Sequence, residues 1–175
     1  MKRAATLLSM TVFGIFSATQ DSGLAAQTRP DFAGRWTVEP DTAGDLGSGW
    51  GSSITITQDA NRLVVEYAFF EPREMQPPLS FVYALDGSET TASVMLGRGI
   101  QTQTSSARWD GASFVITTRH PFENPVTDEP MTSVVRRTIS LESPTSLIVV
   151  TERQGVLGGP SSTTRTVYRK LQSPA

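Results

Sequence analysis

Short turns and long connections alternate along this chain, and this alternation constrains the fold more than any other feature. Four compact turn signals stand between runs of alternating apolar residues: Asp59-Ala60-Asn61, Asp86-Gly87-Ser88, Trp109-Asp110-Gly111 and Ser143-Pro144-Thr145. The longer connections are residues 40–52, 71–79, 121–130 and 154–161. In an antiparallel meander, successive turns lie at opposite ends. We therefore expect the long connections to gather at one end, the rim, and the short turns to close the other, the floor.

The runs between these turns have the two-residue period of β-strands. Helical periodicity is nearly absent after the first 26 residues, and Pro, Gly, Thr and Ser interrupt the chain too often for a long helix. Ten strands are predicted, at about 33–39, 53–58, 62–70, 80–85, 89–96, 100–108, 112–120, 131–141, 146–153 and 163–171. With an even number, the first and last strands run in opposite directions and can pair. The sequence thus predicts an all-β antiparallel meander that closes into an up-and-down barrel of about eight to ten strands.

The first 26 residues are typical of a signal peptide. Lys2 and Arg3 precede an apolar run, 7–16, and small residues follow at 23–26. About ten apolar residues are too few to span a bilayer, which disfavours a membrane anchor, and no later segment is apolar enough to insert. Several predicted strands are also shorter than the roughly nine to eleven residues of an outer-membrane barrel strand. We expect a signal peptide at 1–26 and a single barrel domain at 27–175, periplasmic or secreted.

Composition narrows the chemistry of the site. The chain has no cysteine and one histidine, so it offers no disulfide and no thiol nucleophile, and a zinc site is not expected. The formal net charge is −2 with both signs present, which argues against a nucleic-acid partner. The glycine-rich segment 44–51 lacks the Lys-Ser/Thr of a phosphate-binding loop. We therefore expect neither a metal nor a cofactor.

The strand faces indicate an aromatic and aliphatic interior with some polar atoms. Tyr67 and Phe69 share one face of the third predicted strand, and Phe81 and Tyr83 share a face of the fourth. Segment 100–106 differs because it is polar on both faces. Such a strand either borders a water-filled cavity or is poorly covered, and the sequence leaves both alternatives open.

Gly34-Arg35-Trp36 stands on the first strand after Pro30-Asp31-Phe32, and a basic strand ends the fold. This arrangement resembles that of the lipocalins. The resemblance implies that Trp36 packs near the closed end beneath a basic side chain of the last strand, here Arg165 or Arg169. It also implies that the connection 40–52 lies at the open end. The chain is similar, too, to small secreted bacterial proteins that open with Asp-Phe-x-Gly-x-Trp.

His120 is the candidate catalytic residue. It stands where an apolar strand face reaches the rim, and an imidazole suits acid–base chemistry near neutral pH. The alternative is a histidine that ends its strand and is capped by the turn at Pro121.

Arg137 is the candidate anchor for an anionic group. It lies between Val135 and Ile139 on one face, so an inward orientation requires a partner for its guanidinium, such as a ligand carboxylate. Three alternatives remain open. The face is reversed and Arg136 points inward, or Arg137 pairs with Glu66, or it pairs with Glu152.

Four further residues are placed at the rim by the order of the turns: Trp50, Met75, Arg98 and Phe122. Trp50 lies between two glycines and acts either as a lid or as a plug at the top of the barrel.

Together these patterns favour a barrel that binds a small apolar or amphiphilic molecule. The predicted ligand-binding residues are Trp50, Tyr67, Phe69, Phe81, Tyr83, Phe122 and Arg137. One alternative is an enzyme of isomerase, cyclase or hydratase type, in which His120 is the acid or base and Arg137 or Tyr67 orients the substrate. The other is a packed structural or interaction domain without a ligand.

Overall fold

The structure is a computed structural model that describes residues 29–39, 50–67, 79–96 and 99–172. These residues contain ten strands, in agreement with the sequence prediction. The strands are β1 (Gly34–Val38), β2 (Ser53–Gln58), β3 (Arg62–Tyr67), β4 (Leu79–Ala84), β5 (Thr90–Leu96), β6 (Gly99–Asp110), β7 (Ser113–Glu123), β8 (Pro130–Ser143), β9 (Ser146–Arg153) and β10 (Ser162–Lys170). The predicted signal peptide, 1–26, lies outside the described residues.

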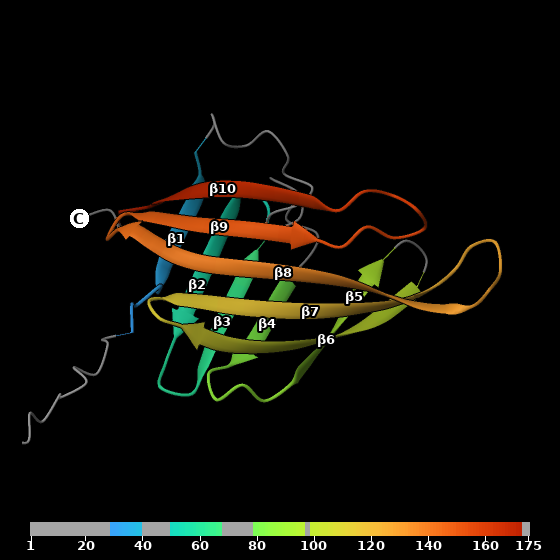
Figure 1. The fold of residues 1–175 in the computed structure, drawn as a ribbon. Helices are drawn as coiled ribbons and strands as arrows, with labels where there is room; N and C mark the ends of the chain where they lie inside the picture. The colour runs from blue at the N-terminus through green and yellow to red at the C-terminus, as the bar shows by residue number, and fades with distance from the viewer. Residues whose placement is uncertain (1–28, 40–49, 68–78, 97–98, 173–175) are drawn as a thin grey trace, which may run out of the picture.

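All ten strands belong to one antiparallel sheet with the order β4-β3-β2-β1-β10-β9-β8-β7-β6-β5. The first and last strands pair as predicted, with Trp36 opposite Lys170. In Figure 1, β1 to β4 pass behind β6 to β10 and cross them steeply. The two ends of the sheet, β4 and β5, lie in contact but form no ladder in the described residues. The fold is therefore an up-and-down barrel that is nearly closed, with a seam between β4 and β5.

The barrel has the two ends that the turns predict. Short turns join β6 to β7 and β8 to β9 at the floor, through residues 111–112 and 144–145. The connections 124–129 and 154–161 join β7 to β8 and β9 to β10, and Figure 1 shows both projecting beyond the sheet at the opposite end, the rim. Most of the rim connections 40–52 and 71–79 lies outside the described residues.

The segment before β1 closes the floor. The side-chain amide of Gln58 donates to the Pro30 carbonyl at 3.2 Å, and the Phe32 amide donates back to Gln58 Oε1 at 3.1 Å. These bonds place the buried Phe32 ring against Trp109, with ring centroids 5.7 Å apart. The Trp36 indole donates to the Phe32 carbonyl at 3.0 Å. Large aromatic rings thus fill the narrow end of the barrel.

The basic partner of Trp36 is Lys170, and the expectation of Arg165 or Arg169 is wrong. Lys170 Nζ lies 5.2 Å from the centroid of the indole. On β10 the even-numbered residues face the interior, so Arg165 and Arg169 face solvent. There they form ion pairs with Glu142 and Glu39.

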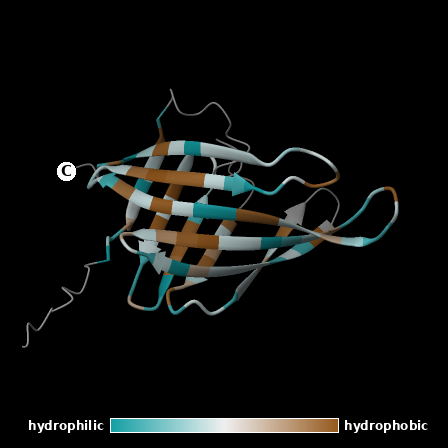
Figure 2. Cartoon of the chain, in the orientation of Figure 1, coloured by the Kyte–Doolittle hydropathy of each residue, from teal (hydrophilic) through white to brown (hydrophobic). Residues whose placement is uncertain are grey.

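The interior changes from apolar at the floor to polar towards the rim. In Figure 2 the hydrophobic stretches of β7 and β9 lie in the half nearer the short turns, and both strands become hydrophilic towards the long loops. The polar segment 100–106 follows this gradient. Gln103 and Ser105 are buried on the inner face of β6, and Ser105 Oγ lies 2.9 Å from Thr118 Oγ1 of β7. The inner faces of β6 and β7 therefore carry polar side chains in their rim halves.

Candidate binding site in the barrel interior

Arg137 and Thr151 lie directly opposite each other on β8 and β9. Both face the interior, because the next residues along the same faces, Ile139 and Val149, are fully buried. Arg137 Nε is buried and has no hydrogen-bond partner. Thr151 is 1% exposed, and its Oγ1 is likewise buried without a partner. Two adjacent polar atoms in the barrel wall are thus left unsatisfied, which is uncommon in folded proteins.

None of the three alternatives for Arg137 holds. Arg136 points outward and pairs with Glu152 at 3.5 Å across the outer face. Glu66 is also on the outer face, since its neighbour Val65 is buried inside. Among the residues that the structure describes, no carboxylate forms an ion pair with Arg137.

Trp50 holds the Arg137 guanidinium in place. Arg137 Cζ lies 5.5 Å from the centroid of the indole, within the range of a cation–π contact. Trp50 is 1% exposed and packs against Tyr83, with ring centroids 6.5 Å apart. Next to it, the Tyr168 hydroxyl donates to the Gly51 carbonyl at 3.0 Å. Trp50 is therefore buried in the interior, with its ring close to the guanidinium whose Nε has no partner.

Three tyrosines surround this point, and their hydroxyls stay protonated at neutral pH. Burial raises the pKa of Tyr83 to about 12, although the nearby Arg137 opposes the shift. Burial likewise raises the pKa of Tyr168 to about 12. The pKa of Tyr67 is also raised, mainly by burial, and its ring stacks on Phe81 with centroids 5.5 Å apart. The protonated Tyr83 hydroxyl can therefore donate a hydrogen bond to an anion, whereas the Tyr168 hydroxyl already donates to the Gly51 carbonyl.

His120 faces the interior from β7, and its environment favours the neutral imidazole. Burial is the main cause that lowers its pKa, and the positive charges of Arg137 and Arg153 lower it further. At neutral pH the ring can therefore accept a proton or a hydrogen bond. Arg153 lies on the inner face of β9, two residues beyond Thr151, so a second positive charge faces this region.

The structure brings most of the sequence-predicted residues together. Trp50, Tyr83 and Arg137 are in contact, and Tyr67 stacks on Phe81 beside them. Phe122 lies further along β7 towards the rim, partly buried, opposite Met131. Phe69, Met75 and Arg98 lie outside the described residues.

Sequence reasoning missed two residues, Thr151 and Tyr168. Thr151 shares a face with Leu147 and Val149, so the two-residue period of β9 places it inside. Tyr168 carries no such signal, because its neighbours Thr166 and Val167 are buried as well. Even for Thr151, alternation gives no reason to single out a residue until the pairing of the strands is known.

The described residues offer no cluster of His, Asp or Glu that could hold a metal ion. Within the same part of the chain, no helix is long and apolar enough to cross a membrane.

Comparisons with protein-family models and with curated proteins find no match to this chain. Its function is therefore inferred from the geometry and chemistry of the barrel.

Proposed function

We propose that this protein is an exported, lipocalin-like carrier that binds a small amphiphilic molecule with an anionic head group inside the barrel. The observation that carries the proposal is the facing pair of unsatisfied polar atoms, Arg137 Nε and Thr151 Oγ1. A buried donor and a buried hydroxyl without partners cost free energy unless a ligand completes them. A carboxylate or similar anion would accept from both groups.

The charge at this point supports an anion over a neutral polar group. A guanidinium without a carboxylate partner contributes a hydrogen bond to a charged ligand worth about 1.5–3 kcal/mol. Arg153 faces the same region, and the protonated hydroxyls of Tyr83 and Tyr168 lie close enough to Arg137 for its charge to affect their pKa values. Arg137 forms no ion pair with a carboxylate of the described residues, so its charge can attract an anionic ligand group.

The apolar part of the ligand would lie along the aromatic wall. Tyr67, Phe81 and Tyr83 are consecutive inward residues of β3 and β4, and Trp50 packs against the last of them. Phe122 would extend the contact at the rim. Such a wall next to a few convergent polar groups is the usual composition of a small-molecule site.

The test compares two adjacent arginines of opposite orientation. Arg137→Gln removes the inward guanidinium, and Arg136→Gln removes the outward one as a matched control. Each variant is titrated with a long-chain carboxylate and with the alcohol of the same length, which lacks the charge. We expect Arg137→Gln to weaken carboxylate binding by at least about tenfold and alcohol binding much less, and Arg136→Gln to change neither.

Two results would count against the carrier. Equal losses for the carboxylate and the alcohol would remove the anion-specific role of Arg137. If the unaltered protein bound neither compound nor any apolar dye, a packed structural domain would be favoured instead.

A second candidate is an enzyme on the same barrel, of isomerase, cyclase or hydratase type. One observation favours it: His120 is kept neutral beside two arginines, which suits a general base near a site that stabilises a developing negative charge. His120→Ala should then abolish turnover of a bound anionic substrate without lowering its affinity. Carrier function alone predicts no turnover in either protein.

A further inference from the structure

The most exposed apolar side chains are concentrated at the rim. The described residues include five large hydrophobic side chains with high exposure: Val82 at 42%, Ile100 at 72%, Val126 at 87%, Leu157 at 53% and Leu171 at 43%. The three most exposed are Ile100, near the rim end of β6, and Val126 and Leu157, in the rim connections 124–129 and 154–161. Single exposed apolar residues need no explanation, but their concentration at one end of the barrel does.

Leu157 is held outward by a strained turn. The Gly159 amide donates to the Val156 carbonyl at 2.9 Å, and Leu157 and Gly158 between them have φ values of 51° and 81°. Two residues with positive φ inside this bond form a turn of type I′, which strongly favours Asn, Asp or Gly at its first central position. A leucine there costs conformational free energy and presents its side chain to solvent. Folding alone gives no reason for a leucine at this site.

Val126 is held in a similar way. Its amide donates to Asn124 Oδ1 at 3.0 Å, and the connection is closed by bonds from the Asn124 amide to the Glu129 carbonyl and from the Asp128 amide to the Asn124 carbonyl, both 2.8 Å. The loop is thus internally hydrogen-bonded and keeps its valine away from the barrel. Figure 1 shows this loop and the Leu157 loop projecting at the same end.

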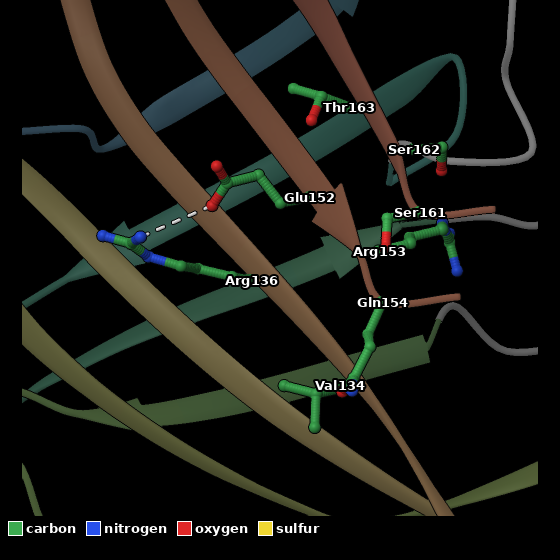
Figure 3. Close-up of a pocket in the computed structure, with 8 residues that line it drawn as sticks. All are labelled: Val134, Arg136, Glu152, Arg153, Gln154, Ser161, Ser162 and Thr163. Carbon is green, nitrogen blue, oxygen red and sulfur yellow. Dashed lines mark ion pairs between the residues drawn. The ribbon is translucent and has the colours of Figure 1, made fainter. Parts of the chain in front are cut away.

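A polar pocket of about 340 Å³ lies at the foot of the Leu157 loop. Figure 3 shows the residues that line it: Val134, Arg136, Glu152, Arg153, Gln154, Ser161, Ser162 and Thr163. The pocket contains charges of both signs together with hydroxyl groups. Its ion pair between Arg136 and Glu152 is long, 3.5 Å, and both side chains are nearly half exposed, so a ligand with both charges can compete for it.

We propose that the rim docks onto a phospholipid bilayer with zwitterionic head groups. Ile100, Val126 and Leu157 enter the surface of the bilayer, and the pocket accepts a head group, its phosphate near Arg136 and its ammonium near Glu152. A protein partner fits less well, because three separate side chains bury far less than the roughly 1,200 Å² of a stable protein interface. A bilayer accepts such separate insertions.

The test uses the full-length mature protein and vesicles made of phosphatidylcholine and phosphatidylethanolamine. The variant Leu157→Asn with Val126→Thr removes two apolar tips while it keeps both loops, since asparagine suits the positive φ of residue 157. The control is Leu171→Asn, an exposed leucine at the floor. In flotation assays the double variant should lose at least about tenfold in vesicle binding, and the control should match the unaltered protein.

Three results would overturn the proposal: no vesicle binding by the unaltered protein, undiminished binding by the double variant, or an equal loss in the control. Leu157→Asn should also raise the melting temperature, so lost binding is not a sign of misfolding. The proposal does not rest on the interior site. The double variant should still bind a long-chain carboxylate inside the barrel. This result distinguishes loss of membrane docking from loss of ligand binding.

Discussion

Replacing Arg137 with methionine should make the protein more stable while it removes anion binding. Methionine is flexible and close to arginine in length, so it can fill the same space. The change takes away a charge that has no carboxylate partner in the described residues, and a buried Nε that has no hydrogen-bond partner.

Two opposing contributions decide the size of the effect. Loss of the contact between Arg137 and Trp50, at 5.5 Å, costs about 0.5–2 kcal/mol. Removal of an unsatisfied buried donor returns about 1–3 kcal/mol. The second range is larger, so we expect the free energy of unfolding to rise by about 1 kcal/mol. For a domain of this size the melting temperature then rises by roughly 2–4 °C.

Urea unfolding of the two methionine variants would measure this. Arg136→Met is the control, because it removes an exposed ion pair that contributes at most about 1 kcal/mol. A loss of more than 1 kcal/mol in Arg137→Met would refute the reasoning, since it would mean that the guanidinium is satisfied without a ligand.

Two further changes test the interior and the floor. The pKa of His120 is lowered in the folded protein, so the unfolded chain binds its proton more tightly. The free energy of unfolding should fall as the pH drops below about 6.5 and on through the folded pKa. In His120→Gln, the free energy of unfolding measured in urea should depend less on pH between pH 8 and 5.5. An unchanged pH dependence would assign the effect to another group. At the floor, Gly34 has a φ of 147°, and a Cβ there would meet the Lys170 side chain over Trp36. Gly34→Ala should lower the free energy of unfolding in urea by about 1–3 kcal/mol. This loss should exceed that of Lys170→Met, which removes only the cation–π contact. A Gly34→Ala variant as stable as the unaltered protein would contradict the positive φ of residue 34.

The number and order of the strands were predictable because the signals for them are local. Turn residues such as Asp86-Gly87-Ser88 and the alternation of apolar residues are read over a few positions, and all ten strands lie close to their expected bounds. The orientation of Arg137 was predictable for the same reason, since Val135 and Ile139 flank it on one strand.

The identity of the basic residue over Trp36 was not predictable in this way. Val167 is buried although it lies on the outer face of β10, so apolar residues do not mark the inner face of this strand. Only the pairing of Trp36 with Lys170 shows which basic side chain points inward.

The position of Arg137 directly opposite Thr151 also depends on how β8 and β9 pair. It follows from the register of β8 and β9, which shifts between Leu141 and Ser143 near their turn. A shift of one residue would send one of the two side chains outward. Local patterns do not report such a shift.

The pairing of β1 with β10 has a consequence for biosynthesis. Because β1 pairs with β10, the barrel cannot close before β10 has been synthesised. Until Ser162–Lys170 emerge, β1 keeps a free edge that later joins the sheet. The growing chain is therefore an open sheet until β10 inserts between β1 and β9, and the pairing of β10 with both strands completes the barrel.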